Sequence, residues 1–543
     1  MTDKSGRNAG RGMTRRQLLA LVGKAAGGGA MYQAMSAMGM ATPSTYAGPL
    51  KLEGARRDQK ILVLGAGMAG LSAAFELRNA GYQVKVLDFN SRAGGRSWTI
   101  RGGDEYTELG GRKQVCGFEK GLYINPGPWR IPHHHYGMLD YAKRLGVPLE
   151  PFMMVNYSSY LHSTKAFGGK PQRYGAVQAD FHGHVAELLG KVVQQKRLDE
   201  SLTKEDQERL LEALKSWGAL DAQYRYVAGK ESALRRGWAI APGGGLMPAA
   251  QASEPVGLDS LLSSNLWRYL MVSQEYSFQT AIFQPVGGMD QIAMAVYREV
   301  KDIVQLNSKV VKIDQSEKGV TVSYVPSHGD GPAQQEQADW CVCTIPLSIL
   351  SQIDITVQQP MQDAIRAVPY ASAVKVGLQF RRRFWEQDEQ IYGGITFTDL
   401  PIGMVSYPST SYGSAGKGVL LGAYIFGNHA YEFTAMAPAD RVRAAFEQGA
   451  TIHPQYREEF ENGMAVGWHR VPWTNGCFGA WTEERRDKHY ANLCAIDGRI
   501  VLAGEHASYI PAWQEGAVLS SHDAITRLHQ KIIAGTSPAK ASA

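Results

Sequence analysis

The chain has 543 residues, 44% of them hydrophobic, which is enough to bury a large core and suggests more than one domain. Its formal charge of +6 is concentrated at one end: residues 1–57 hold nine Lys or Arg against two Asp or Glu, so the other residues sum to −1. Because the rest of the chain is close to neutral, the charge does not indicate a nucleic-acid partner. The five cysteines are too few and too irregularly spaced for a disulfide framework or a C-x-x-C metal site.

Residues 1–57 are predicted to be a leader or flexible tail. Arg15 and Arg16 precede an Ala-, Leu- and Gly-rich stretch that runs to about Met40, a layout that resembles a twin-arginine export signal. Because the stretch is only mildly apolar and contains Lys24, we expect no permanent membrane span. The resemblance implies a periplasmic or secreted protein; a disordered tail on a cytoplasmic protein is the alternative. The cleavage site is left open.

The next segment has the order strand, glycine turn, helix, strand and acid. The apolar run at residues 61–64 leads into Gly65-Ala-Gly67-Met-Ala-Gly70 and a helix-spaced segment, and a second apolar run ends at Asp88. Gly65 permits a tight turn, Gly67 lets backbone N–H groups approach a pyrophosphate, and Gly70 lets helix and strand pack closely. Asp88 stands where a carboxylate can bind both hydroxyls of an adenosine ribose. The segment predicts a dinucleotide-binding fold.

A second glycine pair, Gly94-Gly95, follows between Arg92 and Arg96. Two small residues open the backbone to a closely approaching ligand, and a guanidinium beside them can pair with a diphosphate. NAD-binding folds do not need this second loop, so the pattern favours FAD.

Farther along the chain, other patterns indicate packing and secondary structure. Three adjacent histidines, residues 133–135, cannot converge on one ion without intervening turns, so we expect no metal site. Residues 200–215 form a charged amphipathic pattern with a Ser/Thr start signal, which predicts a helix. Cys341-Val-Cys343 indicates buried packing. Residues 374–380 and 419–426 are strand-like and predict an antiparallel sheet.

Together these motifs identify a family. Arg92-Ala-Gly-Gly-Arg-Ser-Trp-Thr99, placed after a dinucleotide fingerprint, resembles the R-x-G-G-R-x-x-T segment of the flavin amine oxidases, which include monoamine, polyamine and L-amino-acid oxidases. Residues 285–290, the strand around Val310, and residues 500–506 and 513–518 resemble its other flavin segments, so the resemblance runs from about residue 58 to 535. It implies FAD, which we expect to be noncovalent because neither Cys477 nor Cys494 stands in an evident flavinylation motif. The expected cofactor residues are Gly65, Gly67, Met68, Ala69, Gly70, Asp88, Phe89, Arg92, Gly95, Arg96, Gly110, Gly111, Arg112, Val310, Gly504, Glu505, Trp513, Glu515, Gly516 and Ala517.

The resemblance also implies a binding site for a substrate carboxylate. Arg130, in an R-x-P segment similar to that of L-amino-acid oxidases, is expected to pair with the carboxylate, and Tyr424 to support it. An insertion separates Arg130 from Gly110-Gly111-Arg112, which departs from the family's compact arrangement and makes Arg112 a competing candidate. Trp513 matches the aromatic residue beside the flavin.

Three further residues complete the expected site. Lys375 matches the family's lysine, which holds a water against the reactive ring nitrogen; exposure to solvent is its alternative. Ala512 stands where the family offers a carbonyl to the amine. Trp481 is a candidate wall of the side-chain pocket and, with Trp513, could imitate the aromatic cage of a monoamine oxidase.

We therefore predict a mixed α/β (α+β) fold with a Rossmann-like FAD-binding domain, an antiparallel-sheet substrate domain and a helical insertion. The predicted boundaries are 58–113, 285–366 and 468–535 for the FAD domain, 114–149, 271–284 and 367–467 for the substrate domain, 150–270 for the insertion, and 536–543 for a tail. The expected activity is oxidative deamination of L-amino acids by FAD and dioxygen, giving 2-oxo acids, ammonia and hydrogen peroxide. A primary-amine or polyamine oxidase and an amino-acid 2-monooxygenase are the alternatives; a weakly catalytic scaffold is less favoured, and a homodimer is left open.

Overall fold

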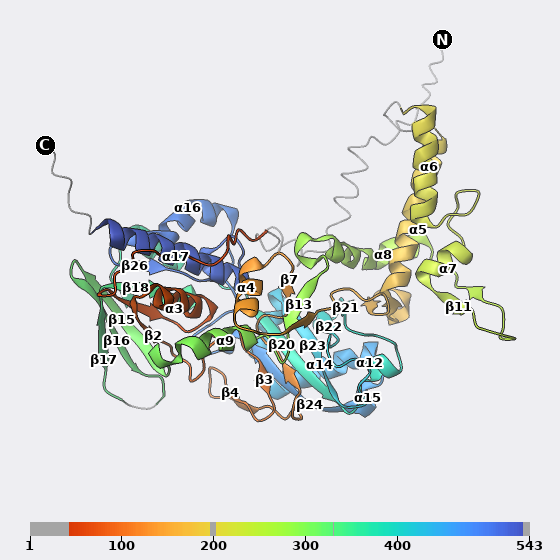
Figure 1. The fold of residues 1–543 in the computed structure, drawn as a ribbon. Coiled ribbons are helices and arrows are strands. Elements are labelled where there is room, and N and C mark those ends of the chain that lie inside the picture. The colour runs from red at the N-terminus through yellow and green to blue at the C-terminus, as the bar shows by residue number, and fades with distance from the viewer. Residues whose placement is uncertain (1–42, 196–201, 329–330, 536–543) are drawn as a thin grey trace, which may run out of the picture. The chain divides into compact units, whose positions relative to one another are not determined.

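A computed structural model describes residues 43–195, 202–328 and 331–535 (Figure 1). The described residues divide into a larger unit, residues 43–154, 275–394 and 401–535, and a smaller unit, residues 155–274 and 395–400. The predicted export signal and the C-terminal tail lie outside the described residues.

A six-stranded sheet is the centre of the larger unit. Its order is β14 (Val304–Gln305), β2 (Gln83–Leu87), β1 (Lys60–Leu64), β18 (Trp340–Cys343), β26 (Ile500–Leu502) and β25 (Ile496–Asp497). All neighbours are parallel except β25 and β26. The helices α3 (Met68–Ala80) and α17 (Gln514–Ala534) pack on one another beside this sheet, and α9 (Gln291–Val300) packs on α3 (Figure 1). Cys341 and Cys343 on β18 are fully buried, as predicted.

A second sheet contributes to the wall of the predicted cofactor site. Its order is β17 (Gln334–Ala338), β16 (Gly319–Pro326), β15 (Ser308–Ser316) and β19 (Asp354–Ile355). The strand β15 begins at Ser308, whose backbone N–H donates to the carbonyl of Asp88 at 2.7 Å. This bond places Val310 of β15 close to the end of β2.

The predicted antiparallel sheet is confirmed in the larger unit. Here β22 (Met404–Ser406), β23 (Gly418–Phe426), β20 (Ala373–Phe380) and β24 (Phe460–Gly467) lie in that order. Every residue of β20 is buried, and its register places Lys375 opposite Tyr424. The helices α13 (Gly427–Ala435) and α14 (Pro438–Ile452) pack against these strands.

Shorter elements connect these sheets. A three-stranded sheet joins β7 (Ile131–Pro132), β13 (Ile282–Pro285) and β8 (Leu149–Pro151), and α4 (Tyr136–Arg144) follows β7. Two hairpins pair β3 (Ile100–Arg101) with β6 (Tyr123–Ile124) and β4 (Glu105–Thr107) with β5 (Lys113–Val115). The remaining helices of this unit's described residues are α10 (Leu347–Leu350), α11 (Gln359–Ala367), α12 (Phe384–Gln387), α15 (Tyr456–Glu459), α16 (Glu483–Cys494) and the short 3-10 turns.

The smaller unit is mainly helical. It contains α5 (Tyr174–Gln194), α6 (Lys204–Gly218), α7 (Lys230–Arg236), α8 (Leu258–Ser264), and the strands β9 (Tyr160–His162), β10 (Gln172–Arg173), β11 (Trp238–Ile240), β12 (Gln251–Ala252) and β21 (Ile395–Thr398). The predicted amphipathic helix is confirmed as α6, and the predicted Ser/Thr start signal is Thr203, whose side chain accepts a hydrogen bond from the N–H of Asp206. The insertion was predicted at residues 150–270. The observed unit comprises residues 155–274 and also residues 395–400.

No helix among the described residues is both long and apolar enough to cross a bilayer.

Candidate active site

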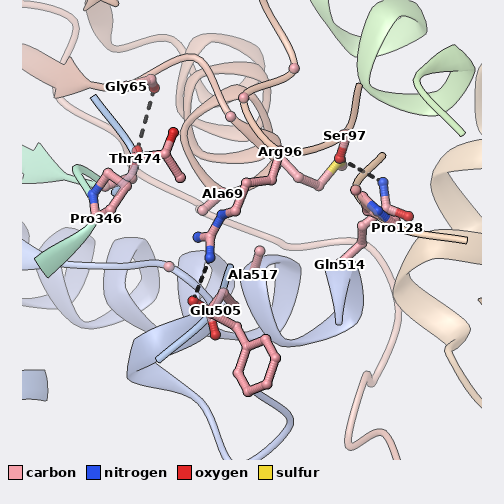
Figure 2. A pocket seen from close by; sticks show the side chains of 18 of the residues that line it. Gly65, Ala69, Arg96, Ser97, Pro128, Pro346, Thr474, Glu505, Gln514 and Ala517 are labelled. Atoms are coloured by element: carbon pink, nitrogen blue, oxygen red, sulfur yellow. Dashed lines mark hydrogen bonds and ion pairs between the residues drawn. The ribbon is translucent and has the colours of Figure 1, made fainter. Parts of the chain in front are cut away.

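One deep pocket lies within the larger unit (Figure 2). Its empty space, mouth included, is about 1530 Å³. The predicted residues that line it are Gly65, Gly67, Met68, Ala69, Asp88, Phe89, Gly95, Arg96, Arg130, Val310, Tyr424, Gly504, Glu505, Ala512, Trp513 and Ala517. The fold thus brings together residues from both ends of the chain and from the middle.

The glycine turn between β1 and α3 fits a diphosphate. Gly65 has a φ of +106°, a left-handed conformation that favours glycine. A Cβ on Gly70 would lie 1.8 Å from the carbonyl oxygen of Gly65, so this position needs close packing and does not line the pocket. At Gly67 the nearest atom to a Cβ would be 3.9 Å away, which leaves open space at the N-terminus of α3. Backbone N–H groups at such a terminus bind phosphate oxygens well.

Asp88 directly follows β2 and lines the same pocket. Its Oδ2 accepts from the N–H of Ala66 at 2.5 Å, and its Oδ1 accepts from the N–H of Asn90 at 2.7 Å. Burial raises the pKa of this carboxyl. These two bonds fix the carboxylate between the glycine turn and the loop after β2, where a ribose is expected.

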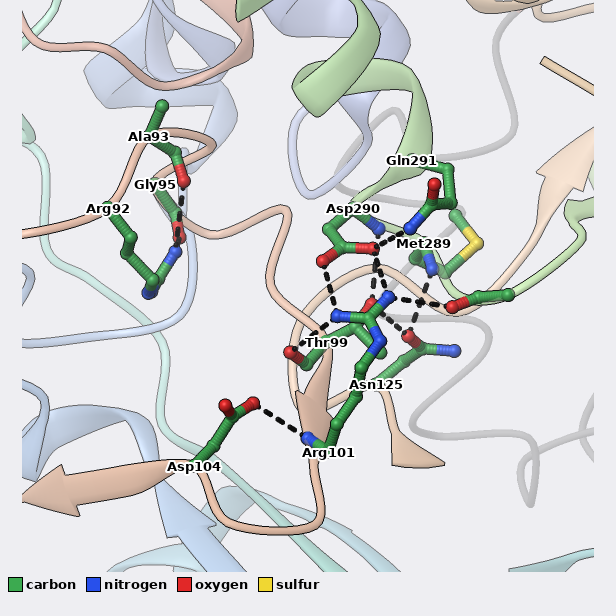
Figure 3. Close-up of polar contacts among 11 residues, drawn as sticks. Arg92, Ala93, Gly95, Thr99, Arg101, Asp104, Asn125, Met289, Asp290 and Gln291 are labelled. Carbon is green, nitrogen blue, oxygen red and sulfur yellow. Dashed lines mark hydrogen bonds and ion pairs between the residues drawn. The ribbon is translucent and has the colours of Figure 1, made fainter. Parts of the chain in front are cut away.

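The two arginines of the second glycine loop do not occupy equivalent places. Arg96 lines the pocket, and its Nη1 donates to Glu505 Oε1 at 2.7 Å (Figure 2). The same nitrogen donates to the carbonyl of Cys477 at 2.8 Å. Arg92 does not line the pocket; its Nη1 donates to the carbonyl of Gly95 at 2.8 Å (Figure 3). The prediction that Arg92 contacts the cofactor is therefore not supported, because its guanidinium is hydrogen-bonded to the backbone of the glycine loop.

The turn at Gly110, Gly111 and Arg112 also lies elsewhere. These residues are exposed and join β4 to β5, and none of them lines the pocket. The three residues that we expected at the cofactor thus form a hairpin turn, which needs glycines for its own backbone. Arg112 is also unsuited to a buried carboxylate, since its side chain faces solvent.

Glu515 binds another part of the protein. Its two carboxylate oxygens accept from the N–H groups of Gly137 and Met138 at 2.9 and 2.8 Å, and Oε1 accepts from Ser44 Oγ at 2.5 Å. It therefore caps the N-terminus of α4 and does not line the pocket. Gly516 is likewise a packing position, because a Cβ there would lie 2.1 Å from the carbonyl oxygen of Ile510.

A predicted segment, residues 285–290, and one more predicted residue, Trp481, also lie away from the pocket. The segment 285–290 holds the end of the R-x-G-G-R-x-x-T motif: the N–H of Asp290 donates to Thr99 Oγ1, and the Asp290 carboxylate receives two bonds of 2.8 Å from Arg101 (Figure 3). Trp481 is buried, and its Nε1 donates to the carbonyl of His506. It belongs to the hydrophobic core, so the prediction of a pocket wall is wrong.

An aromatic region surrounds Arg130. The Arg130 side chain is buried, with its Cζ 4.8 Å from the ring centre of Trp129 and 5.6 Å from that of Trp513. Tyr424 packs edge to face on Trp129, with ring centres 5.2 Å apart. Arg130, Tyr424 and Trp513 therefore share one end of the pocket, as the resemblance implies. Phe426 also lines this end.

Lys375 is buried next to this aromatic region. Its Nζ donates to the carbonyls of Gly127 at 2.6 Å and Asn125 at 3.2 Å, and lies 4.4 Å from the ring centre of Tyr424. Gly127 and Tyr424 line the pocket, whereas Lys375 does not. Burial lowers the pKa of the ammonium group to about 7. The expected alternative of a lysine that faces solvent is wrong, because the side chain is 1% exposed.

The three adjacent histidines have separate environments. His135 lines the pocket and packs edge to face on Trp513 at 4.9 Å, while His134 Nε2 contacts Ser277 Oγ at 3.2 Å. Burial lowers the pKa of His135 well below its usual value. Within the described part of the chain, no cluster of His, Cys, Asp and Glu could hold a metal ion.

Several pocket residues were not predicted from the sequence to lie at the site. These are Trp129, His135, Met138, Ser308, Thr344, Ile345, Pro346, Trp468, Trp473, Thr474, Cys477 and Phe478. Most lie in loops whose place at the pocket depends on the tertiary fold. Trp129 is the exception, because it directly precedes Arg130.

Comparison with known proteins identifies the family. The sequence model described as "Flavin containing amine oxidoreductase" matches residues 68–528. The chain belongs to this family. It is therefore an oxidoreductase and a flavoprotein, and the predicted fold class is confirmed.

Relatives and solved structures add detail. The chain is 28% identical to a putative L-amino-acid oxidase, YobN, of Bacillus subtilis (strain 168), over 86% of this chain and 94% of that protein. It is 29% identical to an L-amino-acid oxidase of Vipera ammodytes ammodytes, over 85% of this chain and 90% of that protein. Cyclohexylamine oxidase from Brevibacterium oxydans IH-35A has a TM-score of 0.58 at 17% identity, over 88% of this chain and 100% of that chain. Putrescine oxidase has a TM-score of 0.56 at 18% identity, over 88% and 99%. The two structures are similar to this chain in fold.

Proposed function

We propose that this flavoprotein binds FAD noncovalently and oxidises L-amino acids to 2-oxo acids, with release of ammonia and hydrogen peroxide. The observation that carries the proposal is the buried Arg130 side chain, which lines the pocket and packs on Trp129, the same ring on which Tyr424 packs. A buried arginine suits a carboxylate, which an amino acid has and a simple amine lacks. Relatives named L-amino-acid oxidases, which match over most of the chain, support the same substrate class.

The distribution of charge in the pocket disfavours a diamine. Among the described residues, the acids that line it are Asp88 and Glu505. Asp88 accepts from two backbone N–H groups, and Glu505 is paired with Arg96. Neither is left to bind a second ammonium group at the aromatic end, where Arg130 would repel one.

The residues at the aromatic end have defined tasks in this reaction. When bound, FAD would supply the acceptor for a hydride from the substrate and the reductant for dioxygen. Arg130 and Tyr424 hold the substrate carboxylate, which fixes the direction of the Cα–H bond, and the walls formed by Trp129 and Trp513 exclude water. Lys375 lies next to this region, and because burial lowers its pKa to about 7, its amino group can hold or release a proton near neutral pH.

A substrate panel with an Arg130 variant tests the proposal. L-Phenylalanine and other L-amino acids are compared with their decarboxylated amines, with peroxide as the readout. We expect Arg130→Ala to lower activity on amino acids by about thirtyfold or more, because loss of a buried charge-assisted pair costs roughly 2–5 kcal/mol. Activity on the amines should not fall in parallel. Arg112→Ala, which removes an exposed arginine, is the matched control and should have little effect.

The outcomes separate the alternatives. An equal loss on amino acids and amines would make Arg130 a structural residue, and a preference for amines in the parent protein would favour an amine or polyamine oxidase. Mass spectrometry of the product separates a 2-oxo acid from the amide that an amino-acid 2-monooxygenase would yield.

A further inference from the structure

Residues 43–47 form an irregular segment that packs on the larger unit. Ser44 and Tyr46 are half-buried, whereas Pro43, Thr45 and Ala47 are exposed, so alternate residues contact the protein. Tyr46 packs against the hydrophobic core of this unit. The segment directly follows the stretch in which an export signal is predicted, yet its contacts belong to the folded body.

Ser44 binds a buried carboxylate at the start of two helices. Its Oγ donates to Glu515 Oε1 at 2.5 Å; Glu515 lies in the first turn of α17 and accepts from the N–H groups of Gly137 and Met138 at the start of α4. Burial raises the pKa of Glu515, and its three hydrogen bonds oppose this rise. Among the described residues, no Lys or Arg forms an ion pair with it. Its charge therefore depends on these bonds, of which the Ser44 hydroxyl donates one.

Tyr46 bridges the same two helices. Its hydroxyl donates to Asp140 Oδ2 of α4 at 2.7 Å, and its ring centre lies 5.6 Å from that of His522 in α17. The backbone N–H of Tyr46 donates to Ser44 Oγ at 3.1 Å, which leaves the proton of that hydroxyl for Glu515. Residues 44–46, which we call the strap, thus hold α4 and α17 together through two side chains.

The helices that the strap joins contribute one wall of the pocket. His135 and Met138, at the start of α4, and Trp513 and Ala517, at the start of α17, line the pocket. His135 packs edge to face on Trp513 at 4.9 Å, and the Cζ of Arg130 lies 5.6 Å from the ring centre of Trp513. Because small displacements of groups around a substrate weaken its binding, the strap acts on the Arg130 end of the pocket through this wall.

We propose that Ser44 and Tyr46 are positioning residues for the substrate wall of the pocket, and that the export leader is therefore cleaved on the N-terminal side of Ser44. The proposal rests on the proposed function and on the predicted export signal. Small residues that suit cleavage stand at Ala41 and Ala47. Cleavage after Ala47 would remove both strap residues and leave every residue that lines the pocket in the chain.

Kinetics measured per bound flavin test the strap. Ser44→Ala should raise the KM for L-phenylalanine, and the Kd for benzoate as a carboxylate without an amine, roughly three- to tenfold. A hydrogen bond to a charged group is worth about tenfold or more in an equilibrium constant, and we expect part of this to reach the pocket. The kcat and the flavin content should change by less than about twofold, because the strap contacts neither the glycine turn nor Arg130.

Three further variants complete the comparison. Ser44→Thr keeps the hydroxyl and should restore most of the affinity. Tyr46→Phe removes the bond to Asp140 and should change the KM in the same direction as Ser44→Ala. Thr45→Ala removes an exposed hydroxyl from the same segment and is the matched control, which should leave both constants unchanged.

The failures are distinguishable. A lower melting temperature of Ser44→Ala and Tyr46→Phe with an unchanged KM and benzoate Kd would overturn the strap, because the segment would then only stabilise the fold. If the parent prefers amines and does not bind benzoate, the substrate assignment fails, and the KM for the amine tests the strap by the same comparison.

N-terminal sequencing of protein exported by a bacterial host tests the cleavage. A mature chain that begins at or before Ser44 is the expected result. One that begins at Gly48 and has the KM of a chain that keeps Ser44 would overturn the whole proposal. A chain exported without cleavage would overturn the cleavage part alone, since the kinetic comparison does not depend on it.

Discussion

Replacement of Lys375 by Met should change the pH dependence of stability in a predictable way. Burial lowers the pKa of the ammonium to about 7 from the ordinary 10.5, so the folded protein binds this proton less well than the unfolded chain does. Burial of the protonated Lys375 therefore lowers the free energy of unfolding. This destabilisation is absent above pH 10.5, grows as the pH falls, and reaches its full size below pH 7. At about 1.4 kcal/mol per pKa unit, the shift corresponds to about 5 kcal/mol in full, about 4 kcal/mol at pH 7 and about 1.5 kcal/mol at pH 9.5.

Methionine removes this cost and keeps the length of the side chain. The carbonyls of Asn125 and Gly127 lose their donor, which offsets part of the gain by about 1–3 kcal/mol each at every pH. The pH-dependent part is therefore diagnostic: the stability of the variant relative to the parent should fall by about 3 kcal/mol between pH 7 and pH 9.5.

Urea unfolding of both proteins at the two pH values, with FAD at saturation, measures this difference. Lys165→Met, which removes an exposed lysine, controls for the loss of one positive charge. A difference between Lys375→Met and parent that is the same at both pH values would refute the reasoning, because it would show that burial does not perturb the ionisation of Lys375.

Three other predictions concern the cofactor, dioxygen and export. Gly67→Val should give folded but colourless protein, because its side chain would enter open pocket space. Gly70→Ala should fail to fold, because its Cβ would collide with the carbonyl of Gly65. Flavin absorbance and circular dichroism distinguish the two outcomes. Lys375→Met should slow reoxidation of the reduced flavin by dioxygen much more than its anaerobic reduction by an L-amino acid, because a nearby positive charge stabilises superoxide-like species; stopped-flow absorbance follows both, and loss of reduction alone would place the lysine on the substrate side. Changing Arg15 and Arg16 to Lys should keep the folded protein in the cytoplasm of a bacterial host, and unchanged periplasmic activity would contradict an export signal.

The parts of the site that were predictable from sequence depend on local geometry. Gly65, Gly67 and Asp88 lie within one short strand, turn, helix and strand, so their positions follow from the backbone of that unit. Lys375 and Tyr424 lie on strands that the sequence also indicates, although their pairing in register is a tertiary feature. Alternation alone does not say which residue of one strand faces which residue of another.

The errors have a common physical cause. A Gly-Gly-Arg segment suits a phosphate-binding loop and a hairpin turn equally well. In this protein Arg112 lies in a hairpin turn, the one between β4 and β5. A carboxylate at a helix start, such as Glu515, can serve a ligand or the N-terminus of another helix, and here it caps α4. Trp473 carried no signal, because its position at the pocket arises when residues 471–477 return to the loop after β2. In each case the partner is chosen by segments far apart in sequence.

The order of strands in the parallel sheet has an effect on how the protein is made. β1 is synthesised early, but one of its neighbours, β18, comes some 280 residues later, and the neighbour of β18, β26, is made near the end of the chain. At about 5–20 residues per second, roughly 20–90 seconds pass between the emergence of β1 and that of β26 from the ribosome. During this time the early glycine turn has no completed sheet behind it, and Trp513 and Ala517 do not yet exist. We therefore expect flavin to be captured only after β26 and α17 have been made, so that nascent chains arrested before residue 500 should bind none.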